Sequence, residues 1–138
     1  MKTLETLTKV AAKKVEEKQK EIADLQKVID QMLARKAHLQ SSIQAEYKVA
    51  ETSGDANMFQ MAGHYHQRAK AELVDIDEAM ANAQKIMGEK RAQLQNLFAE
   101  QKRYEILLER RKAEAHKERL KKDQAVMDEL GSQKEKTF

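Results

Sequence analysis

Two histidines two positions apart, His64 and His66, are the side chains best suited to metal chemistry in this sequence. Imidazole is a common metal ligand, and a close pair could hold one ion. On a helix, however, residues two positions apart point about 200° away from each other, so the pair could share an ion only in an extended segment. We interpret both histidines as polar residues of a hinge beside Gly63.

A second candidate for ion binding is the acidic run of Asp75, Asp77 and Glu78. Carboxylate oxygens bind calcium, but this run has neither the spacing nor the central glycine of a calcium-binding loop. The simpler interpretation is a solvated helix face around Ile76.

Motifs for catalysis are absent from the sequence. There is no glycine-rich phosphate loop, no G-x-S-x-G sequence, no cysteine nucleophile and no Glu-x-x-His motif of a carboxylate-bridged metal site. The sequence therefore predicts that the protein is not an enzyme and that it uses no cofactor, no metal and no small-molecule substrate.

The composition favours long helices. The 138 residues include no Pro, Cys or Trp, and 36% of them are charged. Without cysteine, a disulfide framework and a zinc finger are both excluded, and the reducing cytosol is the expected compartment. The N-terminal residues lack the apolar run of a signal peptide or a membrane span, so we expect a soluble, unexported protein.

Apolar residues recur at spacings of three and four from Val15 to Ala50, and the stripe extends back to Leu4. This pattern predicts a first helix over about residues 3–51. The same spacing resumes at Ala69 and continues to Leu108, after which Ala115 is the only apolar residue at a position of this stripe. We therefore predict a second helix over about residues 59–130.

The segment 52–58 has the residues of a turn. Gly54 can take the left-handed conformation that ends a helix, and Asp55 or Asn57 can cap the next one. Gly131 is predicted to end the second helix, leaving 131–138 as a tail.

A short turn between two narrow apolar seams favours an antiparallel hairpin. The predicted fold is all-α, a single long two-helix coiled coil in which Leu4 lies opposite about residue 106. Residues 109–130 then form a C-terminal helical overhang of about 30 Å. We expect a monomer; the alternative is a homo-oligomeric coiled-coil scaffold, in which the second helix pairs with its own copy.

A basic cluster occupies the predicted overhang. Residues 110–122 contain seven basic side chains and two glutamates. The basic residues are Arg110, Arg111, Lys112, Lys117, Arg119, Lys121 and Lys122. Nucleic acid is a less suitable partner because no aromatic residue interleaves with these charges. Two interpretations remain: the cluster binds an acidic protein surface, or it is an ordinary solvated helix.

The C-terminal sequence resembles that of FliJ-type flagellar export proteins. The resemblance lies in three segments: Lys102-Arg103-Tyr104-Glu105, Leu107-Leu108-Glu109-Arg110-Arg111 and the closing Met127-Asp128-Glu129-Leu130. The dipeptide Glu46-Tyr47 is similar to a Glu-Tyr pair that precedes the turn in that family. Family members often carry an aromatic residue shortly before the leucine matched by Leu73, where this chain has Arg68 and Ala69.

The resemblance implies a non-catalytic stalk of the flagellar type III secretion apparatus, in the cytoplasm and peripheral to the inner membrane at the flagellar base. It implies three partners: the export ATPase ring, the export-gate membrane protein and the export chaperones. Tyr47 and Leu73 would contact the gate. The residues expected on the ATPase side are Arg103, Tyr104, Arg110, Arg111, Lys117, Arg119 and Lys122.

Overall fold

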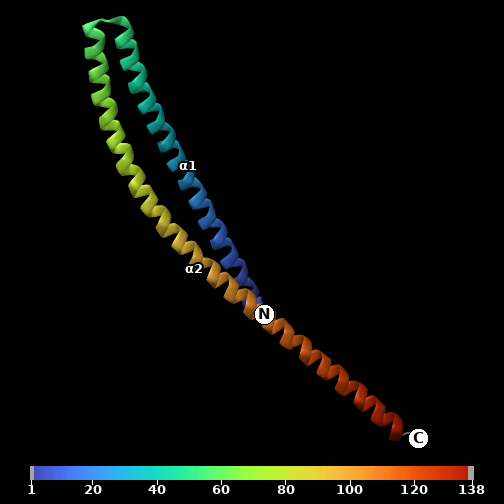
Figure 1. Cartoon of the computed structure of the whole chain (residues 1–138). Helices are drawn as coiled ribbons and strands as arrows, with labels where there is room; N and C mark the ends of the chain where they lie inside the picture. The colour runs from blue at the N-terminus through green and yellow to red at the C-terminus, as the bar shows by residue number, and fades with distance from the viewer. Residues whose placement is uncertain (1, 137–138) are drawn as a thin grey trace. The chain divides into compact units, whose positions relative to one another are not determined.

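The computed structural model describes residues 2–136 and the side chains of residues 2–134. This part of the chain contains two α-helices, α1 over Lys2–Ser53 and α2 over Ala56–Lys136, and no strand (Figure 1). The predicted fold class, an all-α hairpin of two long helices, is confirmed. No stretch of either described helix combines the length and the low polarity that a membrane-spanning segment needs.

The helices divide into two compact units, each of which contains a part of α1 and a part of α2. The first unit combines the residues up to Glu16 with those from Gln95 onward. The second unit is the continuous stretch Glu17–Leu94, which includes the turn.

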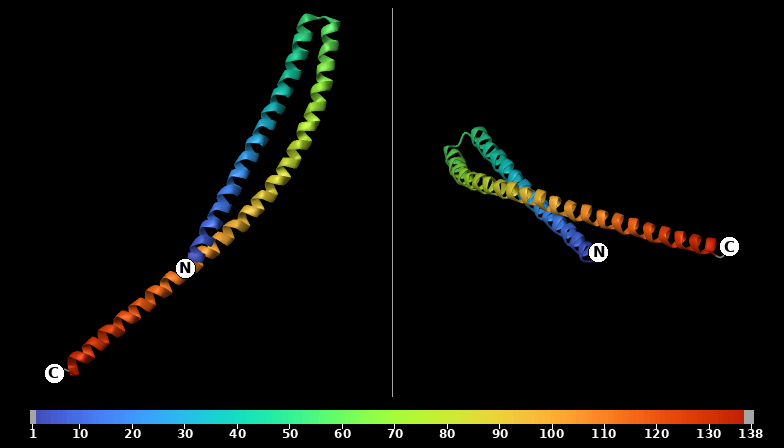
Figure 2. Two further views of the ribbon diagram at one scale, coloured as in Figure 1. Left: turned by 180° about the vertical axis from the view of Figure 1, so that it is seen from behind. Right: turned by 90° about the horizontal axis from the view of Figure 1, so that it is seen from below.

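A connection of two residues, Gly54 and Asp55, joins α1 to α2 in the second unit (Figure 2). Gly54 has a φ of 65°, and its N–H donates to the carbonyl oxygen of Ala50 at 3.2 Å, which satisfies a carbonyl at the end of α1. The Asp55 carboxylate then accepts from the backbone N–H of Asn57 at 2.9 Å and caps α2. Both residues have the roles that the sequence predicts for them, with Asp55 and not Asn57 as the cap.

Contacts across the second unit show that the two helices run antiparallel. Between Lys18 and Tyr47 on α1, the partners on α2 move back from Gln93 to His66. The contacting pairs are Lys18 with Gln93, Glu21 with Lys90, Arg35 with Glu72, Lys36 with Asp77, and Tyr47 with His66.

The core of the second unit is a narrow seam. Ile29 on α1 and Ala83 and Met87 on α2 form a buried cluster, against which Ile22 and Leu25 pack. These residues follow the spacing of three and four that the sequence shows, so burial of one stripe on each helix holds the pair together.

Small residues line the seam nearer the turn. Ala50, Ala62 and Ala69 are each at most 3% exposed. With side chains of this size at the contact, the two backbones can approach closely.

In the first unit, the N-terminal part of α1 buries Leu4, Ala11 and Val15. On α2, half-buried positions recur at the same helical spacing, and the last of them is Ala115. They are Leu97, Gln101, Tyr104, Leu108 and Ala115, together with Glu100 and Glu105. All residues from 116 to 134 are exposed, so the buried seam does not extend into this stretch of α2.

The prediction that Gly131 ends the second helix was wrong, because α2 continues through it to Lys136. Among the described glycines, only Gly54 has a positive φ, and a glycine ends a helix efficiently when it takes that conformation. The residues after Gly131 include Gln133 and Lys134, which favour helix and allow it to continue.

The expected hinge beside Gly63 was also wrong. Gly63 lies within α2, and the preceding Ala62 is only 1% exposed. Packing of this turn against α1 therefore keeps a glycine helical where its intrinsic propensity is low.

Candidate partner-binding surfaces

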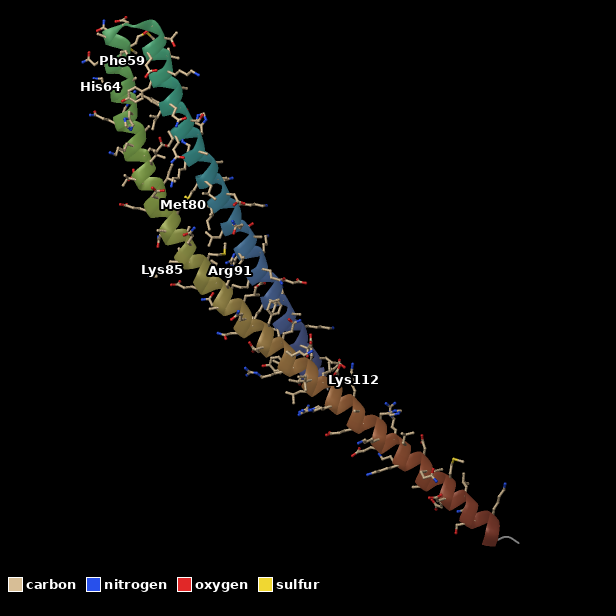
Figure 3. All side chains as sticks on the ribbon, viewed as in Figure 1. Phe59, His64, Met80, Lys85, Arg91 and Lys112 are labelled. Carbon is tan, nitrogen blue, oxygen red and sulfur yellow. The ribbon has the colours of Figure 1, made fainter. Side chains whose placement is uncertain are left out.

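The basic cluster of residues 110–122 lies on α2 in the first unit. Arg110, Arg111, Lys117, Arg119 and Lys122 are all exposed. None of them forms an ion pair with another residue of the described chain. Beyond Lys112, side chains project from α2 with no second helix alongside (Figure 3). The cluster is therefore a charged helical surface open to a partner.

The two sequence-predicted residues that precede this cluster differ in exposure. Arg103 is exposed, whereas Tyr104 is half-buried and donates a hydrogen bond from its hydroxyl to Glu100 Oε1 at 3.4 Å. Because Tyr104 is half-buried, it offers less surface to a partner than Arg103 does.

A group of large apolar side chains further along α2 was not predicted from the sequence. Leu120, Val126, Met127 and Leu130 are between 55% and 69% exposed. The last of the seam residues is Ala115, so these four lie beyond the paired part of the helix. Their concentration on an unpaired helix could have been found by comparing their positions with the predicted end of the seam.

Tyr47 and Leu73, the residues expected to contact the export gate, both lie in the second unit and are half-buried. Tyr47 is on α1, and its hydroxyl oxygen lies 3.3 Å from Nδ1 of His66 on α2. The two rings meet edge to face, with centroids 5.7 Å apart and an interplanar angle of 79°. Leu73 lies two turns beyond His66, about 10 Å along the helix.

The structure explains why this chain has no aromatic residue at position 69. Ala69 is 3% exposed and belongs to the close contact between the helices. A large ring there would force the helices apart. One turn earlier, His66 contributes a ring to the contact with Tyr47 on α1.

Ion pairs between the helices flank these residues. The Arg35 guanidinium donates to both carboxylate oxygens of Glu72, at 2.9 and 3.1 Å. This pairing holds the pKa of Glu72 below its ordinary value and raises that of Arg35. Lys36 pairs with Asp77 at 2.8 Å, so one carboxylate of the acidic run is engaged in helix pairing.

A second ionic group lies further from the turn. Glu21 accepts from Lys18 at 2.8 Å and from Lys90 at 3.2 Å. Hydrogen bonds from Lys18 and then Lys90 lower the pKa of Glu21. Lys18 also donates to the side chain of Gln93. Charged residues at otherwise apolar seam positions, Lys18, Lys36 and Lys90, were the signal for these pairs in the sequence.

The histidines do not form a metal site in the described chain. His64 and His66 both lie on a continuous helix, and His64 is exposed on the outer side of α2 (Figure 3). No group of three or more metal-ligating side chains occurs among the described residues.

The candidate residues thus fall into two groups, Tyr47 and Leu73 in the second unit, and the seven residues from Arg103 to Lys122 in the first.

Comparison with known families gives one match: the family model described as "Flagellar FliJ protein" matches residues 1–135. Neither the curated proteins nor the solved structures gave a match.

Proposed function

Since the chain belongs to the FliJ family, a non-catalytic family of proteins with a role in flagellar export, we propose that it is a stalk and adaptor of the flagellar type III export apparatus. It works at the cytoplasmic side of the inner membrane at the flagellar base. ATP chemistry belongs to its partner.

The exposed C-terminal part of α2 docks into the ring of the export ATPase. The observation that carries this proposal is the exposed basic cluster of residues 110–122, which lies where the buried seam of the helices ends. Seven positive charges against two negative ones suit an acidic protein surface, and they would speed its encounter with the helix.

The second unit contacts the export-gate membrane protein through Tyr47 and Leu73. Half-buried aromatic and leucine side chains are suited to this role because they expose part of their apolar surface while the rest is held by packing. Export chaperones are the third class of partner, which the protein escorts between ATPase and gate.

A charge-reversal experiment tests the ATPase contact. The variant R110E/R111E/K117E is expected to lose binding to the purified export ATPase in a pull-down at low salt, with helicity unchanged by circular dichroism. The matched control K27E/K70E/K85E changes the same number of exposed charges in the second unit and should retain binding. Equal binding by the first variant and the unmodified protein would rule out this docking surface.

A further inference from the structure

The contact between Tyr47 and His66 joins the two helices at one of the residues assigned above to the gate. The Tyr47 hydroxyl oxygen and His66 Nδ1 are 3.3 Å apart. The edge-to-face geometry of the rings, with centroids 5.7 Å apart, is a favourable arrangement for an aromatic pair. His66 therefore holds the ring of Tyr47 and its polar end at the same time.

From this geometry we infer that His66 is a positioning residue, which fixes the orientation of Tyr47 for binding to the export gate. The inference rests on the proposed gate contact of Tyr47. His66 itself acts through Tyr47.

The chemistry of the pair gives a specific mode of action. With the imidazole neutral and its proton on Nε2, Nδ1 accepts a hydrogen bond from the Tyr47 hydroxyl. A tyrosine ring that is held before binding loses less conformational freedom when the partner arrives, so the affinity is higher than for a free ring.

Neighbouring residues do not duplicate this function. His64, two positions earlier, is exposed on the outer side of α2 (Figure 3). Leu73 is apolar and can offer no hydrogen bond to the phenol. Within the described chain, His66 is the residue whose side chain bonds to Tyr47.

The test measures binding of the full chain to the purified cytoplasmic domain of the export-gate protein, by isothermal titration calorimetry. H66A is expected to weaken binding about three- to tenfold. H66N should restore it to within about twofold, because the asparagine side-chain oxygen occupies nearly the place of Nδ1 and can accept from the hydroxyl. H64A is the matched control and should bind as the unmodified protein does.

A double-mutant cycle separates positioning from a direct contact of His66 with the partner. If His66 acts through the Tyr47 hydroxyl, H66A should weaken gate binding little further when Tyr47 is already replaced by phenylalanine. The losses of affinity caused by H66A and Y47F will then not add. Additive effects, or no rescue by H66N, would overturn the inference. Circular dichroism melts of each variant show whether folding is retained.

The outcomes also separate this inference from the proposed function. If Y47A weakens gate binding but H66A does not, His66 has no positioning role and the gate contact stands. If Y47A binds the gate domain as well as the unmodified protein, the gate contact of Tyr47 fails, and the role of His66 fails with it.

Discussion

Arg35 on α1 and Glu72 on α2 form a two-pronged ion pair between the helices, with N–O distances of 2.9 and 3.1 Å. A planar guanidinium matches a carboxylate in few orientations, so this pair specifies the axial register of the helices. The two side chains are 50% and 43% exposed, and exposed ion pairs add little to stability. Specifying the register is therefore the main contribution of the pair.

The first prediction concerns the stability of the fold at low pH. The pKa values of Glu72 and Glu21 are lowered in the folded chain, so the unfolded chain binds more protons as the pH falls below the ordinary glutamate value of 4.5. The stabilising effect of both carboxylates is present above that value and is lost as the pH falls through their folded-state pKa values.

Thermal melts of E72Q should accordingly show a lower Tm than the unmodified protein at about pH 7, and the difference should vanish toward about pH 2.5. E78Q is the control, because Glu78 is exposed on the same helix. A difference that persists unchanged at the lower pH would contradict this account.

The second prediction concerns the core. Met87 is 4% exposed and packs with Ile29 and Ala83, so Met87→Ala should reduce the free energy of unfolding by about 2–4 kcal/mol. Urea denaturation measures this change. Met61 is 68% exposed, and Met61→Ala should cost less than about 0.5 kcal/mol. Similar costs for the two substitutions would show that the seam is not the core.

The third prediction uses two glycines in different conformations. Gly54→Ala places a side chain at a φ of 65° and should destabilise the protein by about 1 kcal/mol. Gly88 lies inside α2 with open space around its Cα, so Gly88→Ala should stabilise by about 0.5–1 kcal/mol. Urea denaturation of both variants should show opposite signs, and a common sign would disprove the assignment of the turn.

The fourth prediction concerns the exposed C-terminal part of α2. Deletion of residues 116–138 removes a stretch in which residues 116–134 are all exposed, so the Tm of the remaining chain should change little. The same deletion should abolish ATPase binding in the pull-down. A large fall in Tm would mean that this stretch packs against the rest of the protein in solution.

The fifth prediction concerns the number of chains. Light scattering coupled to size-exclusion chromatography should give the mass of a single chain, 15.9 kDa. A mass twice as large or more would support the alternative of a homo-oligomeric scaffold.

Much of the fold could be predicted because its determinants are local. The spacing of apolar residues identified both helices, and the chemistry of Gly54 and Asp55 identified the turn. The prediction failed at Gly63, which was interpreted as lying beside a hinge, and at Gly131, which was interpreted as the end of the helix, because the neighbours of both glycines keep the backbone helical. Glycine lowers helix propensity, but it does not by itself end a helix.

The contacts at the candidate surfaces were harder to predict. The bond from Tyr47 to His66 and the pairing of Arg35 with Glu72 join residues far apart in sequence, and their partners depend on the exact register. A shift of one residue turns a helical side chain by about 100°, so an approximate turn position cannot specify a pair. The role proposed for the basic cluster rests on its position beyond the predicted seam and on the family resemblance.

The two-residue connection between the helices also limits how the second unit can change in length. Because only Gly54 and Asp55 connect the helices, the connection cannot absorb extra residues. An insertion in one helix must therefore be matched by an equal insertion in the other. Whole heptads would keep the apolar stripes facing each other. The stretch of α2 beyond Ala115 is free of this constraint and could lengthen or shorten to fit the depth of a partner without altering the paired helices.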